Sequence, residues 1–457
     1  MKPNAAAVSS LAALVISLAT LTGCKTMDAV EGPATTGADT ATAPTPDTAT
    51  APLPDSVTVP TSLPSHTERQ ITFGPNQHFY GYQGHAGNTP FNHSGTKLAL
   101  LEAAFQDRLV TASDHANVVL VDVATGELRV LTSIRAWNFQ QGTMMYWNPL
   151  KPDEELFFND RTTDGSNKIE TVLFNVNTGA RREFFFPATP FANSGVAQNG
   201  GKFLGINYGR LQRLRPVTGY AGAYDWTVGV AAPTDDGIFL VDVETGASKL
   251  LVSFKQLLDT FVGQHPEMAG KELLINHTLW NRTDTRIIAA VRWMDSTSLS
   301  SIWFTMNPDG TDIRETPNPG HFDWELGQKI IGWYGTEVRL YDTEVDQTLE
   351  VIDPSFFTED GDVAIARDVN WVATFAGPAT NRSIKVYSRA AHAGFEMPGF
   401  DASPYVGDRT AGPTESYTSQ NRLDGSPLWS PDVTKIYRTK MASDGTRQGF
   451  IIDLKWP

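Results

Sequence analysis

Histidines are the residues of this chain best suited to proton transfer, and the sequence contains nine of them. Imidazole exchanges protons near neutral pH and is a common metal ligand. His93 precedes an expected strand at 97–101, and His115 lies just before another at 118–123. If both turns converge on one rim, the two imidazoles form a candidate catalytic pair. The alternative is that each is a solvated turn residue.

Arginines provide a second candidate site. Tyr208, Arg210, Arg213 and Arg215 lie within one short segment that follows an expected strand. On alternating, extended geometry Arg213 and Arg215 share one face. Guanidinium groups bind carboxylate or sulfate through paired hydrogen bonds, so the segment predicts an anion-binding site. The alternative is a set of structural arginine–aspartate pairs.

A third group of polar residues consists of His265, His277 and His321, each near the start of an expected strand. Imidazoles presented toward one channel by neighbouring repeats could bind a divalent metal such as Zn, Ca or Mn. The alternative is that they are buried, hydrogen-bonded core histidines. The sequence contains no phosphate-binding glycine loop, His-Glu-x-x-His or Gly-x-Ser-x-Gly motif.

Short strands separated by turns must position these residues. Three nearly identical turns, at 122–126, 175–179 and 242–246, begin with Asp or Asn and end with Gly. This chemistry predicts hairpins. The best helical candidate is the brief segment 254–261. Apolar or alternating runs of strand length recur along the chain, at 118–123, 172–176, 238–243, 302–306, 338–341, 384–387 and 450–454.

The spacing of the turns predicts the fold class. Looser turns at 307–310, 342–345 and 442–445, with a weaker unit near Tyr387, bring the number of repeats to seven. Units of this length suit four-stranded blades, so we expect an all-β protein, a seven-bladed β-propeller over 67–457. Two β-sandwich domains in series are the alternative, but no long Pro/Gly linker divides this region.

The N-terminal segment differs in composition from the rest of the chain. After a basic start, an apolar run ends in Leu21-Thr22-Gly23-Cys24, which resembles a bacterial lipobox. We therefore expect a lipoprotein signal peptide at 1–23 and a lipidated Cys24 that begins a disordered Ala/Thr/Pro-rich tether at 24–66. The protein would be exported to the outer membrane or cell surface of a Gram-negative bacterium. An ordinary signal peptide with an incidental cysteine is the alternative.

Composition limits the classes of partner. The chain has 457 residues, a net charge of -15 and one cysteine. The acidic balance argues against nucleic-acid binding, although a local basic cleft can still bind an anionic ligand. A single cysteine permits no intramolecular disulfide and no cysteine metal cluster. We expect a monomer.

The order of several short motifs resembles the propeller proteins related to oligogalacturonate lyase, and within them the ulvan lyases of marine bacteria. The resemblance runs from about Gln70 to the C-terminus and is carried by 105–108, 137–142, 158–161, 207–211, 276–281 and 320–324. It implies a seven-bladed propeller and a polysaccharide lyase whose substrate is an anionic, uronate-containing polysaccharide.

The resemblance also implies roles for individual residues. By similarity to ulvan lyases, His93 and His115 match the catalytic base and acid, and Arg210 matches the arginine that neutralises the substrate carboxylate. By similarity to oligogalacturonate lyase, His277 stands near the base position and His321 is a metal ligand.

Two departures from the family pattern concern the site. The sequence reads Asp360-Gly361-Asp362-Val363 where relatives carry Asp-Gly-His-Pro, which puts a manganese site in doubt. Ser194 replaces an expected tyrosine, so Tyr208 is the candidate phenol. We therefore expect a histidine-based, ulvan-type lyase that acts on a sulfated uronate polymer. A non-catalytic glycan-binding or envelope scaffold propeller is the alternative.

Overall fold

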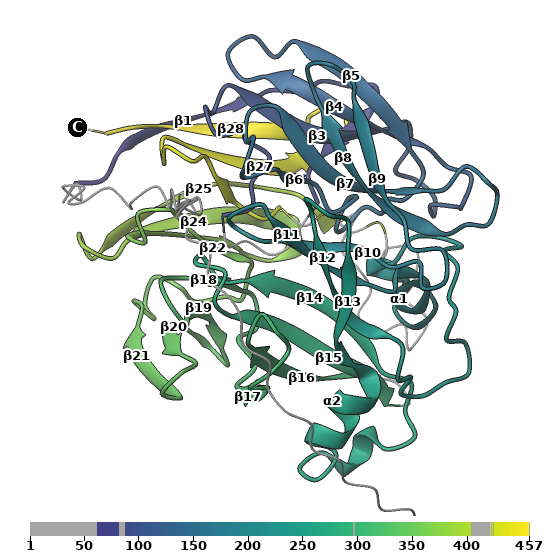
Figure 1. Ribbon diagram of the computed structural model, residues 1–457. Helices are drawn as coiled ribbons and strands as arrows, with labels where there is room; N and C mark the ends of the chain where they lie inside the picture. The colour runs from purple at the N-terminus through teal and green to yellow at the C-terminus, as the bar shows by residue number, and fades with distance from the viewer. Residues whose placement is uncertain are drawn as a thin grey trace, which may run out of the picture. The chain divides into compact units, whose positions relative to one another are not determined.

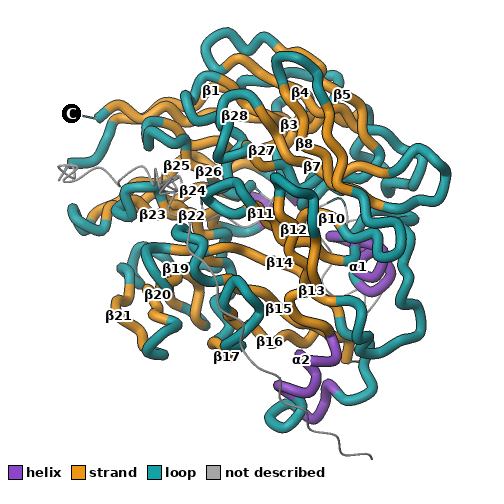
Figure 2. The backbone as a smooth tube through the Cα atoms, viewed as in Figure 1, coloured by secondary structure: helices purple, strands orange, loops and turns teal. Residues whose placement is uncertain are grey.

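Seven four-stranded antiparallel sheets make up the described part of the protein (Figures 1 and 2). The computed structural model describes residues 62–81, 87–295, 298–403, 421, 423 and 425–456. The sheets confirm the predicted all-β, seven-bladed β-propeller. The predicted signal peptide, Cys24 and nearly all of the predicted tether lie outside the described residues.

The blades follow one another along the chain, each running from an inner to an outer strand. Blade 1 contains β2 (Gln77–Phe79), β3 (Lys97–Ala103), β4 (Ala116–Asp122) and β5 (Leu128–Ile134). Blade 2 contains β6 (Tyr146–Trp147), β7 (Glu155–Arg161), β8 (Ile169–Asn175) and β9 (Arg181–Phe184). Blade 3 contains β10 (Ala192–Val196), β11 (Lys202–Ile206), β12 (Gly237–Asp242) and β13 (Ser248–Ser253).

The second half of the ring repeats this order. Blade 4 contains β14 (Leu274–Trp280), β15 (Ile287–Asp295), β16 (Ser298–Met306) and β17 (Arg314–Thr316). Blade 5 contains β18 (Phe322–Trp324), β19 (Lys329–Tyr334), β20 (Glu337–Asp342) and β21 (Gln347–Val351). Blade 6 contains β22 (Val363–Ile365), β23 (Trp371–Ala376), β24 (Arg382–Ser388) and β25 (Ala393–Phe400). Blade 7 contains β26 (Leu428–Trp429), β27 (Lys435–Met441) and β28 (Arg447–Lys455), with β1 (Ser65–Gln70) outermost.

Among the described residues, the helices are short and lie in connections between strands. They are α1 (Tyr208–Leu214), η1 (Pro216–Thr218), α2 (Phe254–Phe261), η2 (Pro266–Met268) and η3 (Ala379–Asn381). The predicted helix at 254–261 is confirmed as α2, which begins with a capping box between Ser253 and Gln256. Within the described part of the chain, no helix is long and apolar enough to span a membrane.

The Asp/Asn-to-Gly segments form hairpin turns, as predicted. In the turn between β4 and β5, Asp122 Oδ1 accepts a hydrogen bond of 2.9 Å from the Thr125 backbone N–H, and Gly126 has φ of 75°. Glycine tolerates this left-handed conformation, which closes the turn. The looser segment 442–445 differs, because it joins the second and third strands of its blade, not the third and fourth.

Blade 7 closes the ring by joining the two ends of the described chain. Strand β1 pairs with β28 from Ser65↔Lys455 to Gln70↔Phe450. It therefore begins two residues inside the range predicted for the tether. The sequence patterns did not reveal this strand, because its outward position leaves it half-exposed and without an apolar run.

The meandering blades give the propeller two distinct ends. Because each blade has four antiparallel strands, its outer strand ends where the next inner strand begins. We call this the inter-blade end, and it also carries the connections between second and third strands. The opposite, hairpin end carries the connections from first to second and from third to fourth strands.

Candidate functional site

His93 and His115 lie at opposite ends of blade 1. His93 is in the connection from β2 to β3, at the hairpin end, whereas His115 precedes β4 at the inter-blade end. The seven residues of β3 separate the two positions, a distance of roughly 20 Å at the usual rise of a strand. The prediction that the two imidazoles converge on one rim is therefore wrong. Both side chains are exposed, and His115 Nδ1 lies 3.3 Å from Ser133 Oγ.

The arginine segment is helical, which corrects the extended geometry predicted for it. Asn207 caps α1 by accepting a hydrogen bond from the Arg210 backbone N–H, and Pro216 follows the helix. Helical spacing removes the alternation on which the shared face of Arg213 and Arg215 depended. Arg215 Nη1 donates to Thr218 Oγ1 at 3.2 Å.

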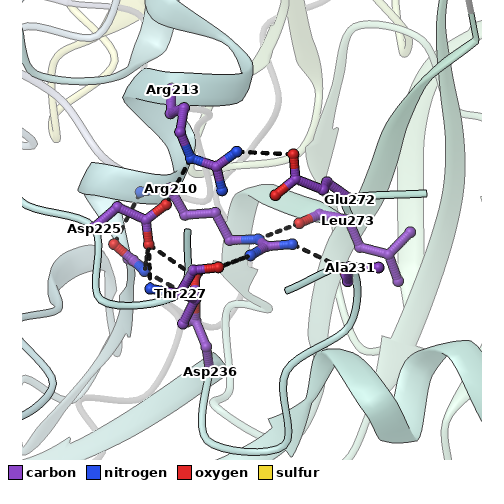
Figure 3. A network of polar contacts seen from close by, with 9 residues as sticks. Arg210, Arg213, Asp225, Thr227, Ala231, Asp236, Glu272 and Leu273 are labelled. Carbon is purple, nitrogen blue, oxygen red and sulfur yellow. Dashed lines mark hydrogen bonds and ion pairs between the residues drawn. The ribbon is translucent and has the colours of Figure 1, made fainter. Parts of the chain in front are cut away.

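Arg210 is part of the protein core (Figure 3). Its side chain is 1% exposed. Nη1 donates to Thr227 Oγ1 at 2.9 Å, Nη2 donates to the Ala231 carbonyl at 2.8 Å, and Nε donates to the Leu273 carbonyl. Burial lowers the pKa of the guanidinium. These bonds hold the loop before β12 and the start of β14, so the predicted contact with a substrate carboxylate is not available to Arg210.

Arg213 forms two ion pairs beside Arg210 (Figure 3). Its Nε lies 2.9 Å from Asp225 Oδ2, and its Nη1 lies 2.9 Å from Glu272 Oε2. Arg213 thus forms the structural arginine–aspartate pair that the sequence left open as the alternative, whereas Arg210 is bound by a threonine and two backbone carbonyls.

Asp236 completes this polar network from below (Figure 3). It is fully buried, and its Oδ2 accepts a hydrogen bond of 2.9 Å from Asn207 Nδ2. Burial raises the pKa of the Asp236 carboxyl to about 7, against the opposing effect of the Asn207 hydrogen bond. The network therefore contains a carboxyl group that titrates near neutral pH.

Tyr208 is also enclosed by protein. Its ring stacks on Tyr220 at 4.4 Å, and its hydroxyl donates to the Asn193 carbonyl at 2.8 Å. Burial raises the pKa of the phenol well above its usual value. The phenol lies beside the position of Ser194, but its hydroxyl already donates to a backbone carbonyl and its ring is stacked, so it acts as a packing residue.

His265 lies at the outer edge of blade 4. Its Nε2 is 3.0 Å from Glu315 Oε2 on the outermost strand β17. The hydrogen bond with Glu315 raises the pKa of the imidazole. His277 is on the innermost strand of the same blade, so three strand spacings, roughly 14 Å, separate the two. His265 and His277 therefore cannot share one metal ion as predicted.

His277 occupies an irregular position on β14. The backbone has φ of 59° at a bulge, where the register shifts between Asn276 and Leu279. The imidazole is half-buried and stacks on Trp303, with ring centroids 5.9 Å apart. The imidazole of this innermost-strand residue thus lies against a side chain of the third strand of its own blade.

His321 connects three blades at the inter-blade end. It precedes β18, and its Nδ1 lies 2.9 Å from Asp360 Oδ1 in the connection to β22. Its Nε2 lies 3.6 Å from Asp362 Oδ1, and Asp362 accepts a hydrogen bond from Ser426 Oγ, ahead of β26. The loops before blades 5, 6 and 7 therefore meet through one histidine and two carboxylates.

These donors do not fit a metal ion in their present arrangement. His321 directs each ring nitrogen at a different carboxylate, whereas a ligating imidazole needs one nitrogen for the metal. In the ranges that the structure describes, no group of three His, Cys, Asp or Glu side chains is arranged to hold one.

Several residues that lie around His277 and His321 were not predicted from the sequence. In the sequence, Asp360 and Asp362 stand out only as a departure from a family motif, although carboxylates just before a strand are a usable signal. Asn276 precedes His277, and Trp303 stacks on it. No sequence pattern distinguishes either residue from an ordinary core residue.

Fold and site together define a seven-bladed β-propeller with a polar site where the inner strands begin. No family model matches the sequence, and no curated protein matches it. Among solved structures, oligogalacturonate lyase in complex with manganese is similar, with a TM-score of 0.56 and 16% identity, over 86% of this chain and 94% of that chain. At this identity the likeness shows the fold alone.

Two further solved structures are similar at lower scores. A prolyl endopeptidase structure has 9% identity and a TM-score of 0.45, over 83% of this chain and 50% of that chain. TolB from Acinetobacter baumannii has 10% identity and a TM-score of 0.34, over 72% of this chain and 57% of that chain. Scores this low carry no argument about function.

Proposed function

We propose that this protein is a polysaccharide lyase that cleaves a uronate-containing polymer by β-elimination. The observation that carries the proposal is a fold shared along 94% of oligogalacturonate lyase. His277 and His321, on neighbouring blades of that fold, support it. A sulfated, ulvan-type polymer is the substrate that we propose in particular, on the motif resemblance described above.

The reaction defines the groups that the site must supply. A base removes the proton α to the uronate carboxylate. The electron pair of that C–H bond forms the new C=C bond, while the bond to the 4-O-linked sugar breaks. The leaving oxygen then takes a proton from an acid. Positive charge at the carboxylate stabilises the enolate-like transition state.

His277 and His321 are the residues that we assign to proton transfer. His277 is half-buried and fixed by the stacking on Trp303, and we assign it as the base. His321 has its Nδ1 held by Asp360. Its Nε2 lies 3.6 Å from Asp362 Oδ1, which is longer than a hydrogen bond. We therefore assign His321 as the group that protonates the leaving oxygen, through Nε2, once the substrate oxygen replaces this contact.

The cellular location follows from the N-terminal motif alone. We propose that Cys24 carries a lipid that holds the propeller on the outer membrane or cell surface, where a polymer is accessible. Metabolic labelling with a clickable fatty acid tests this proposal. Label on the wild-type chain that disappears in Cys24→Ser supports the anchor, and equal labelling of both contradicts it.

The activity is tested with a panel of polymers. The purified chain is incubated with polygalacturonate, ulvan and a neutral glucan, and the absorbance of unsaturated uronyl ends is recorded. A rise with a uronate polymer but not with the glucan is expected. No rise with any uronate polymer would overturn the proposal. Binding without a change of polymer length would then favour the non-catalytic glycan-binding alternative.

A further inference from the structure

One face of blade 4 brings together residues that no sequence motif linked. Asn276 on β14 pairs with Ala290 on β15, and Ala290 pairs with Trp303 on β16. Directly opposed residues of antiparallel strands point to the same face. The Trp303 ring packs edge-on against Phe322 of blade 5 at 5.2 Å. This row of side chains therefore faces blade 5.

His277 joins the row because its backbone is left-handed. In a regular strand its side chain would point away from that of Asn276. The φ of 59° at the bulge turns the imidazole back, so that it lies over Trp303 with an interplanar angle of 21°. A non-glycine residue in this conformation costs free energy, and such residues concentrate at ligand sites.

Arg292 adds positive charge to the same face. It lies two residues beyond Ala290 on β15, which returns its side chain to the same side of the sheet. The guanidinium carbon is 5.6 Å from the Trp303 ring centroid. Both Arg292 and His277 are partly exposed, so a ligand can reach them.

Asn276 supplies an independent sign of a ligand. Its side chain is 1% exposed, and neither its amide nitrogen nor its amide oxygen has a hydrogen-bond partner. A buried amide without a partner costs roughly 1–3 kcal/mol. Native proteins satisfy nearly all such groups, so each exception requires a ligand, a water molecule or another explanation.

We propose that Arg292, His277 and Asn276 form the site that binds the carboxylate of one uronate residue. The guanidinium pairs with the carboxylate, and the amide donates to the same sugar. This places the acidic proton α to the carboxylate beside the imidazole. The identity of the ligand rests on the proposed lyase function. The assignment gives Arg292 the role that the sequence had assigned to Arg210, whose N–H groups are bound to Thr227 and to the carbonyls of Ala231 and Leu273.

The first test compares two arginines of the same blade. Arg292→Met keeps most of the stem but removes the charge, and Arg314→Met does the same on the exposed outer strand β17. With a uronate oligosaccharide, Arg292→Met should raise KM at least tenfold and lower kcat/KM at least 100-fold. Arg292→Lys should recover part of the loss, and Arg314→Met should stay within twofold. Melting temperatures identify any variant that fails to fold.

Binding measurements separate this inference from the proposed function. Calorimetry measures the dissociation constants of a uronate trisaccharide and of its carboxyl-reduced, neutral counterpart. The His277→Asn protein is used because it should bind these ligands without cleaving them. Its tighter binding of the uronate should disappear in double variants that also carry Arg292→Met or Asn276→Leu. Unchanged preference in both double variants overturns the inference, even if the wild type cleaves polymer. If the preference for the uronate depends on Arg292 but the wild type cleaves no polymer, the proposed lyase function is overturned and the proposed binding site is retained. Absence of uronate binding in both the wild type and the His277→Asn protein overturns the inference.

Discussion

His277 has both an unusual backbone conformation and a side chain that can accept a proton. It combines a left-handed backbone with a partly exposed imidazole on the innermost strand of blade 4. Asparagine tolerates the left-handed region but is not a base. His277→Asn should therefore lower kcat by roughly 100-fold or more and leave the melting temperature within a few degrees of the wild type.

A matched histidine provides the control for this prediction. His392 has φ of 47°, is exposed, and lies in the turn between β24 and β25 at the hairpin end. His392→Asn should retain full turnover and stability. Equal turnover of His277→Asn and the wild type, measured as release of unsaturated ends, would remove His277 from the reaction.

Arg210 is expected to affect stability and not substrate binding. Replacing it with methionine leaves the carbonyls of Ala231 and Leu273 without their hydrogen-bond donors. It also removes the positive charge that acts on the buried Asp236 carboxyl. Loss of one partner from a buried charged network costs about 3–5 kcal/mol. Urea denaturation of Arg210→Met should show a loss of this size. A variant as stable as the wild type, but unable to bind uronate, would restore the role predicted from the sequence.

At the scale of elements, α1 shows how a short polar segment can be misassigned. The alternation expected for 208–215 is compatible with a strand, but Asn207 caps a helix there and Pro216 follows its end. The prediction of a helix at 254–261 is confirmed, and the structure adds a capping box between Ser253 and Gln256 at its start.

The loop that holds α1 should also make stability depend on pH. Asp236 has a pKa raised to about 7 by burial, against a value near 4 in the unfolded chain. The folded state therefore binds this proton more tightly. Its contribution to stability is complete below about pH 4 and is lost as the pH rises through 7.

Denaturation at pH 5 and pH 8 measures this effect. The wild type should lose more free energy of unfolding between these pH values than Asp236→Asn, which cannot titrate at this position. An identical loss in both proteins would mean that Asp236 is ionised throughout. Asp401, an exposed residue directly after β25, offers a control substitution that should not change this pH dependence.

At the scale of the whole molecule, closure of the ring depends on β1. Glu68 on this strand lies 2.6 Å from Arg438 Nε and 2.5 Å from Lys440 Nζ. The Arg438 side chain is completely buried. Removing its partner leaves an uncompensated charge, which costs about 3–5 kcal/mol. We expect Glu68→Ala to lower the free energy of unfolding by this amount.

Chemical denaturation of Glu68→Ala beside Glu127→Ala checks this prediction. Glu127 is an exposed residue of a hairpin turn, and its removal should change stability by less than about 0.5 kcal/mol. Similar stability of the two variants would show that the β1–β28 backbone pairing closes the ring without the ion pairs.

The sequence by itself determined the blades, because strand runs and Asp/Asn-to-Gly turns are local signals. The turn at 122–126 and the helix at 254–261 follow from the chemistry of a few neighbouring residues. The site was predictable only in part. His277 and His321 carry the residue type and the position near an inner strand, whereas nothing local marks Asn276 or Arg292 as their neighbours.

Tertiary structure decided which polar residues meet, because contact across a blade depends on strand order and register. The seven residues of β3 place His93 at the opposite end from His115, although both lie in turns. Burial, which depends on the packing of distant segments, made Arg210 a core residue. A single bulge turned His277 toward Trp303. Such contacts join residues far apart in sequence, so residue types and spacing could not specify them.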